Sequence, residues 1–172
     1  MRPLATIALA LVVGSCGAAA AEAHTHAQPL VIYSVAKQEQ YVNNADDRTR
    51  GQGKNPFGNY RDAAPAVKSA APPFPGDEAI FAFALYRDAR LKKKAGSAVF
   101  VCYYNFGKNA YCDASFHLAN GGTLMASGAF NFNAPKFTLA VTGGYGPYVG
   151  KAGVVEERPA ANHSQRLVFR LA

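Results

Sequence analysis

The sequence predicts an all-β fold, an eight-stranded antiparallel β-barrel with one long irregular loop. Three observations lead to this prediction. Short segments alternate apolar and polar residues, clusters of Asn, Gly and Pro separate them at close intervals, and no helical period lasts longer than a turn or two. Eight antiparallel strands joined by short turns can close into a cylinder, which leaves no sheet edge exposed. We therefore expect a single barrel domain over residues 24–172, with residues 43–78 as the long loop.

The strands are expected in two groups. The first two span residues 30–42 and 80–87. Six more follow between short turns, at residues 97–104, 110–118, 123–132, 136–142, 153–157 and 164–171. The glycine-rich stretch 143–150 is expected to be a loop, because Gly and Pro interrupt regular structure.

Residues 43–78 carry so many Gly, Pro, Asn and Asp residues that no long helix or strand is expected there. Loops this long in a small domain often serve function. Asp47 and Arg48 are candidate catalytic residues at the mouth of a pocket, with a carboxylate for proton transfer and a guanidinium for an anionic substrate. The alternative is that the aspartates only bond their own backbone in turns.

Residues 1–23 form a secretory signal peptide by pattern. Arg2 is followed by the apolar run 4–13 and a tail of small residues, and the apolar run is too short to span a bilayer. A lipoprotein signal with Cys16 as the lipidated residue is the rival interpretation. In both cases we expect a secreted or periplasmic protein, and no later stretch resembles a transmembrane helix.

Cys102 and Cys112 lie on consecutive predicted strands around a loop centred near Gly107. Antiparallel pairing about that centre places them opposite each other on one face. In an oxidising compartment we expect a disulfide, and two free buried thiols are the alternative.

The formal net charge of +7 would draw an exported protein to anionic surfaces. The basic residues are scattered, and the one dense run, Lys92-Lys93-Lys94, is expected in a solvated hairpin turn. No nucleic-acid-binding motif is present, and we expect no nucleic-acid partner.

The central strands have one apolar and one mixed face, and the sequence leaves open which face points inward. The apolar face holds the candidate ligand-binding residues. They are Phe100, Tyr104, Phe116, Leu124 and Phe130. If this face points inward, small residues such as Ala114 and Ala126 would leave room for a ligand.

The mixed face carries Asp113, Ser115 and His117, and Asp113 and His117 are candidate catalytic residues. Same-face neighbours along a strand are about 7 Å apart, which argues against a direct bond between Asp113 and His117. The competing interpretation is a row of polar surface residues. No nucleophile elbow, phosphate-binding loop or zinc-ligand spacing occurs, and no metal site is expected.

The glycine spacing of the last seventy residues resembles that of the allene oxide cyclase and dirigent barrels. The residues that carry the resemblance are Asn120, Gly121, Gly122, Thr123, Leu124, Gly128, Gly143, Gly144, Gly146, Tyr148, Gly150 and Gly153. The resemblance covers residues 80–171 and implies a calycin-like eight-stranded barrel with a central pocket open at one end, often trimeric and acting without a cofactor. Tyr145 and Pro147 depart from the plant pattern, and no catalytic residue is carried across.

The leading hypothesis is an exported barrel that binds a small apolar or aromatic molecule and guides a cofactor-free cyclisation, isomerisation or coupling by confinement. The alternative is a non-catalytic ligand carrier or an envelope accessory or structural protein on the same barrel. A charged residue deep in the pocket would favour the enzyme, and an apolar pocket would favour the carrier. A filled barrel without a cavity would indicate a structural module.

Overall fold

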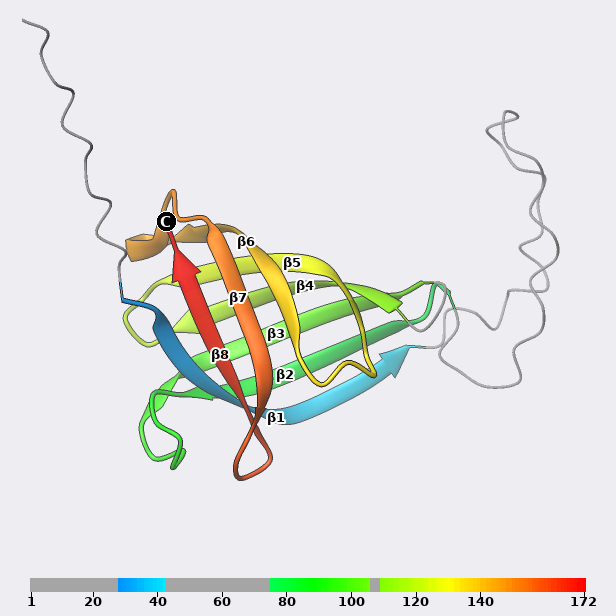
Figure 1. Cartoon of the computed structure of the whole chain (residues 1–172), viewed down its shortest axis with the longest axis horizontal. Helices are drawn as coiled ribbons and strands as arrows, with labels where there is room; N and C mark the ends of the chain where they lie inside the picture. The colour runs from blue at the N-terminus through cyan, green and yellow to red at the C-terminus, as the bar shows by residue number, and fades with distance from the viewer. Residues whose placement is uncertain (1–27, 43–74, 106–108) are drawn as a thin grey trace, which may run out of the picture.

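Eight antiparallel strands close into a barrel in chain order in the computed structural model, which describes residues 28–42, 75–105 and 109–172 (Figure 1). Each strand pairs with the next, and β1 pairs with β8. The strands are β1 (Leu30–Val42), β2 (Glu78–Tyr86), β3 (Lys94–Tyr104), β4 (Asn109–Leu118), β5 (Thr123–Asn131), β6 (Phe137–Tyr145), β7 (Gly153–Ala160) and β8 (Ser164–Leu171). The predicted all-β class and the closed barrel are confirmed.

Helix is almost absent from the described residues. A single 3-10 turn, η3 (Gly146–Tyr148), follows β6. No helix in the part of the chain that the structure describes is long and apolar enough to cross a membrane.

Two strands extend beyond their predicted ends. β7 continues to Ala160, and β6 continues to Tyr145, so the prediction of a loop from residue 143 was wrong for residues 143–145. Gly143 and Gly144 pair with Met125 and Leu124 in the ladder between β5 and β6. A Cβ atom on Gly144 would lie 2.5 Å from the carbonyl oxygen of Tyr148. Glycine therefore serves here to let η3 fold back against the strand, not to end the strand.

The apolar face of the central strands points inward. Along β3, Ala98, Phe100 and Cys102 are buried, whereas Val99 and Tyr103, which alternate with them, are exposed. Strands β4 and β5 show the same alternation of buried and exposed residues. Inward residues of neighbouring strands face each other, as Phe100 of β3 faces Ala114 of β4. The barrel interior is thus the site of burial and the source of the hydrophobic stabilisation.

Side chains fill one end of the barrel completely. Phe116 and Phe169 meet edge to face at 4.9 Å between ring centroids, and both are fully buried. Leu85 and Leu124 are also fully buried and belong to the same core cluster. This packed end holds the start of β1 and the end of β8, and the opposite end of the barrel contains the cavity described below.

The connection between β2 and β3 contains Lys92 and Lys93 of the lysine-rich run, whereas Lys94, also predicted in the turn, begins β3. The carboxylate of Asp88 accepts hydrogen bonds from the backbone N–H groups of Lys93 at 2.7 Å and Arg90 at 3.0 Å. The Lys93 hydrogen bond is the main reason that the pKa of Asp88 lies below its usual value. Lys92 and Lys93 are exposed, as expected for a solvated turn.

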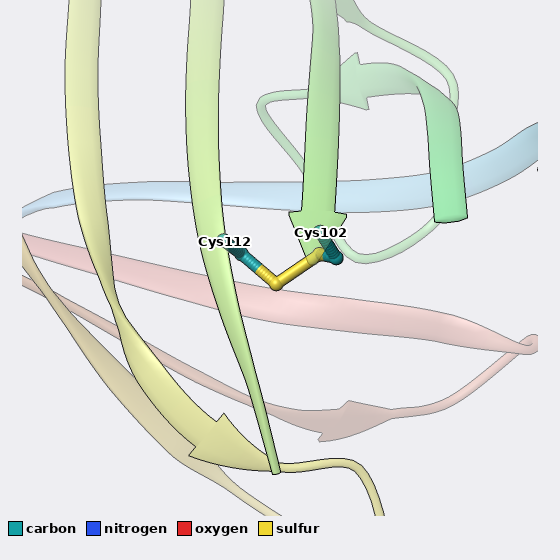
Figure 2. The surroundings of a disulfide bond; sticks show 2 residues. All are labelled: Cys102 and Cys112. Atoms are coloured by element: carbon teal, nitrogen blue, oxygen red, sulfur yellow. A yellow bond between two sulfur atoms is a disulfide. The ribbon is translucent and has the colours of Figure 1, made fainter. Parts of the chain in front are cut away.

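A disulfide joins Cys102 of β3 to Cys112 of β4, as predicted (Figure 2). The two residues are direct partners across the strand pair, with their Cα atoms 4.1 Å apart, and both are buried. The bond closes a short loop, and Cys102 also lines the cavity.

Replacing both cysteines, Cys102→Ala with Cys112→Ala, should lower the free energy of unfolding by about 2 kcal/mol, because a sequence separation of 10 gives only a modest loop-closure term. Urea unfolding of the two proteins measures the change. Wild-type protein reduced with dithiothreitol should unfold at nearly the same midpoint as the variant. An unchanged midpoint in both experiments would contradict a stabilising role.

Candidate active site

A cavity of about 630 Å³ opens at the end of the barrel where β1 and β3 finish. It is large enough for a small organic molecule. The described residues that line it are Ala36, Glu39, Phe81, Phe83, Phe100, Cys102, Tyr104, Phe130, Phe132, Asn133, Ala134, Pro135, Phe137, Glu157, Pro159 and Gln165.

Aromatic rings dominate the wall. Phe81 and Phe83 both face inward because they are two residues apart on β2. Across the cavity, Phe130 and Phe137 stack almost in parallel, with ring centroids 3.9 Å apart. The phenylalanines are only partly covered by their neighbours, so their faces are available to a bound molecule. Such a wall suits a flat, conjugated ligand.

Glu157 is the polar group that lies deepest among these rings. It sits on β7, opposite Phe137 of β6 and Leu167 of β8, and only 4% of it is exposed. Its carboxyl group has no hydrogen bond or ion pair with any residue that the structure describes. Burial raises its pKa to about 8, so the carboxyl group is protonated at neutral pH. The cavity therefore contains a neutral acid that can donate a proton.

The neighbouring Glu156 has the opposite environment. It faces outward, is exposed, and forms an ion pair with Arg170 of β8. The difference follows from the strand geometry, since adjacent side chains point to opposite faces of the sheet. Glu156 therefore serves as a natural control for Glu157.

Glu39 and Tyr104 are the other titratable residues of the described cavity wall. The Tyr41 ring contacts that of Tyr104 edge to face, and the Tyr41 hydroxyl donates a hydrogen bond to the buried carboxyl group of Asp77. Burial raises the pKa of Tyr104, and the charges of Glu39 and Asp77 add to this effect. Within the described ranges, no three His, Cys, Asp or Glu side chains gather to hold a metal ion.

The predicted ligand-binding residues fall into two sets. Phe100, Tyr104 and Phe130 line the cavity. Phe116 and Leu124 are completely buried in the core cluster and are not among the described residues of the cavity wall.

The predicted catalytic candidates lie elsewhere. Asp113 and His117 are exposed on the outer face of β4, and the His117 ring nitrogens lie 3.2 Å from Ser115 Oγ and 3.2 Å from Thr123 Oγ1. The structure does not bring this row to the cavity. Asp47 and Arg48 lie outside the described residues.

The residues predicted from the sequence include neither Glu157 nor the cavity phenylalanines of β2 and β6. One signal was available. Glu156 and Glu157 are adjacent on a strand, and adjacent residues of a closed barrel point to opposite faces. One of these two carboxyl groups had to point inward.

No protein-family model matches the chain, and no curated protein sequence matches it. The structure does resemble solved structures. It matches a pyocyanin demethylase with a TM-score of 0.58, at 20% identity over 84% of this chain and 99% of that chain. It matches AbnU, an exo-specific intermolecular Diels-Alderase, with a TM-score of 0.56, at 18% identity over 84% of this chain and 96% of that chain.

A third similar solved structure is a dirigent protein. The pterocarpan synthase dirigent protein GePTS1 gives a TM-score of 0.58, at 13% identity over 84% of this chain and 86% of that chain. At these identities the likeness establishes the fold. The chain has the barrel fold of the allene oxide cyclase and dirigent type, in agreement with the glycine pattern of its sequence.

Proposed function

We propose that this protein binds an aromatic or conjugated small molecule in its phenylalanine-lined cavity and catalyses a cofactor-free isomerisation, cyclisation or coupling in which Glu157 transfers a proton. The observation that carries the proposal is the burial, in an aromatic cavity, of a carboxyl group that has no partner among the described residues. A buried carboxyl group is costly to keep in a fold unless something uses it.

For an isomerisation or a cyclisation, the chemistry requires no second co-reactant. Glu157 donates its proton to one atom of the ligand, and the resulting carboxylate accepts a proton from another atom. The ligand leaves as an isomer, and Glu157 returns to its protonated form. General acids are most effective when their pKa lies near the working pH, a condition that Glu157 meets.

The cavity wall would supply the confinement. Rings of β2, β5 and β6 would hold a flat ligand in one orientation, which lowers the entropic part of the barrier. The names of the solved neighbours, a demethylase, a Diels-Alderase and a pterocarpan synthase, describe reactions of small organic molecules, and they support the same use of this barrel. An acid within the cavity favours an enzyme over a passive carrier.

The test begins with native mass spectrometry of protein purified from its host, to identify a retained small molecule. That molecule is then incubated with wild-type protein, Glu157→Gln and the control Glu156→Gln. We expect wild type and Glu156→Gln to convert it, and Glu157→Gln to bind it but convert it at least about 100-fold more slowly. Conversion by wild type should fall as the pH rises through about 8, because the protonated form is the donor.

Two outcomes would contradict the proposal. Equal conversion rates for wild type and Glu157→Gln would remove Glu157 from the chemistry. A retained molecule that no variant alters would instead indicate a carrier.

The amino-terminal pattern further supports export, and we propose that the mature protein begins near residue 24. Amino-terminal sequencing of protein from the medium or periplasm checks this. A lipid-modified Cys16 would support the lipoprotein route instead.

A further inference from the structure

The titratable groups of the described cavity wall are all acids, although the chain as a whole is basic. The chain carries a formal net charge of +7, yet the described cavity wall contains no Lys, Arg or His. Its titratable groups are Glu39 on β1, Tyr104 on β3 and Glu157 on β7. The wall residues from β2, β5, β6 and β8 carry no charge. The cavity is therefore an acidic, aromatic site inside a basic protein.

Strand alternation produces this separation. Arg158 follows Glu157 on β7 but is exposed, and Lys136 precedes Phe137 but is also exposed. Because neighbouring residues point to opposite sides of the sheet, the basic groups lie on the outer surface while Glu157 lies inside. A cation on the outer surface would meet repulsion, whereas a cation in the cavity would meet carboxyl groups.

We propose that the ligand is a basic aromatic molecule, a nitrogen heterocycle, which takes the proton of Glu157 and is held in the cavity as a cation. This inference rests on the proposed function and specifies its substrate class. In the transfer, the O–H bond of Glu157 breaks and an N–H bond forms on the ligand. The proton moves within the cavity, and the total charge of the complex stays constant.

Two features of the wall stabilise the resulting pair. The Glu157 carboxylate gains a partner for its charge, which the described residues do not provide, and the phenylalanine faces attract a cation through their quadrupoles. Glu39 at the mouth adds a second negative charge. An anionic ligand would meet repulsion from Glu39 and could not take the proton of Glu157 as a base does, and a neutral hydrocarbon would use only the ring contacts.

The test uses tricyclic probes of matched size at a pH of about 7.5. Free acridine is uncharged there, and its protonated form absorbs and fluoresces at longer wavelength. We expect acridine bound to wild-type protein to show the spectrum of the protonated form, and acridine bound to Glu157→Gln to show the neutral spectrum. Glu156→Gln, the matched surface control, should behave as wild type.

Calorimetry with analogues of different charge tests whether the cavity prefers a cationic ligand. We expect 10-methylacridinium to bind at least about tenfold more tightly than 9-anthracenemethanol, and anthracene-9-carboxylate to bind most weakly. Since 10-methylacridinium brings its own charge, its binding should release about one proton from Glu157, visible as a dependence of the heat on the buffer. Glu39→Gln should weaken its binding about two- to threefold, in keeping with an exposed position.

The outcomes separate this inference from the proposed function. Equal affinity for all three analogues, or a neutral spectrum for acridine on wild type, would overturn the cationic ligand while leaving an aromatic-binding cavity. Cation preference that survives both Glu157→Gln and Glu39→Gln would also overturn it. Failure of every probe to bind would count against the aromatic cavity itself.

Discussion

Raising the pH from about 5 to about 9 should lower the free energy of unfolding of the wild-type protein by up to about 4 kcal/mol, and Glu157→Gln should abolish this loss. The folded pKa of Glu157 is about 8, well above its ordinary value of 4.5. Between these two values the folded protein holds a proton that the unfolded chain has released. Stability therefore falls as the pH rises through this window, and the full loss of stability is reached above pH 8.

Urea unfolding at several pH values measures this effect. Glu156→Gln should reproduce the wild-type slope, because Glu156 is an exposed residue paired with Arg170. The other groups with shifted pKa values titrate outside the range between 4.5 and about 8. The pKa of Asp88 is lowered, so its contribution is lost only in more acidic solution, and that of Tyr104 is raised above 10.0. Parallel slopes for wild type and Glu157→Gln would show that Glu157 is not buried as a neutral acid.

Local patterns were sufficient to predict the strands and one cross-link. The positions of Cys102 and Cys112 about the turn near Gly107 set the register of β3 against β4, and the structure pairs the two residues directly. Alternation along β3 likewise assigns Phe100 and Val99 to opposite faces of the sheet, as the structure has them. These features depend on residues close in sequence, which is why they could be predicted.

The cavity could not be located in the same way, because it depends on closure. Its wall brings Phe83 of β2 near to Phe137 of β6 and Glu157 of β7, which are distant in sequence. The pairing of β1 with β8 fixes these distances, and no local pattern specifies it. The polar types of Asp113 and His117 made them catalytic candidates, with a polar surface row as the competing interpretation, and the barrel places both on its outer face. Composition identifies reactive groups, but closure decides which of them share a cavity.

The glycines of the family-like pattern should differ sharply in their tolerance of substitution. Gly153 begins β7 with φ of +144°, and an added Cβ would lie 2.0 Å from the carbonyl oxygen of Arg170. That oxygen belongs to the backbone of β8, the strand paired with β7, so no flexible side chain can move aside. Gly153→Ala should therefore lower the free energy of unfolding by about 3 kcal/mol or more.

Gly143 provides the matched control from the same pattern. An added Cβ there meets nothing within 4 Å, and its φ is not positive. Gly143→Ala should change the free energy of unfolding by less than about 1 kcal/mol. Gly96 on β3 repeats the Gly153 geometry, with φ of +142° and an added Cβ 1.9 Å from the His117 carbonyl oxygen, so Gly96→Ala should behave like Gly153→Ala.

Urea unfolding of the three variants measures these changes in the free energy of unfolding. For a variant that does not fold, the soluble fraction on expression is measured instead. Gly153→Ala and Gly96→Ala should both fall far below Gly143→Ala on either measure. Three equal midpoints would mean that the strand ends can shift to admit a side chain. The backbone approach at Gly153 would then not explain why glycine stands there, and the likeness to the dirigent pattern at this position would need another physical cause.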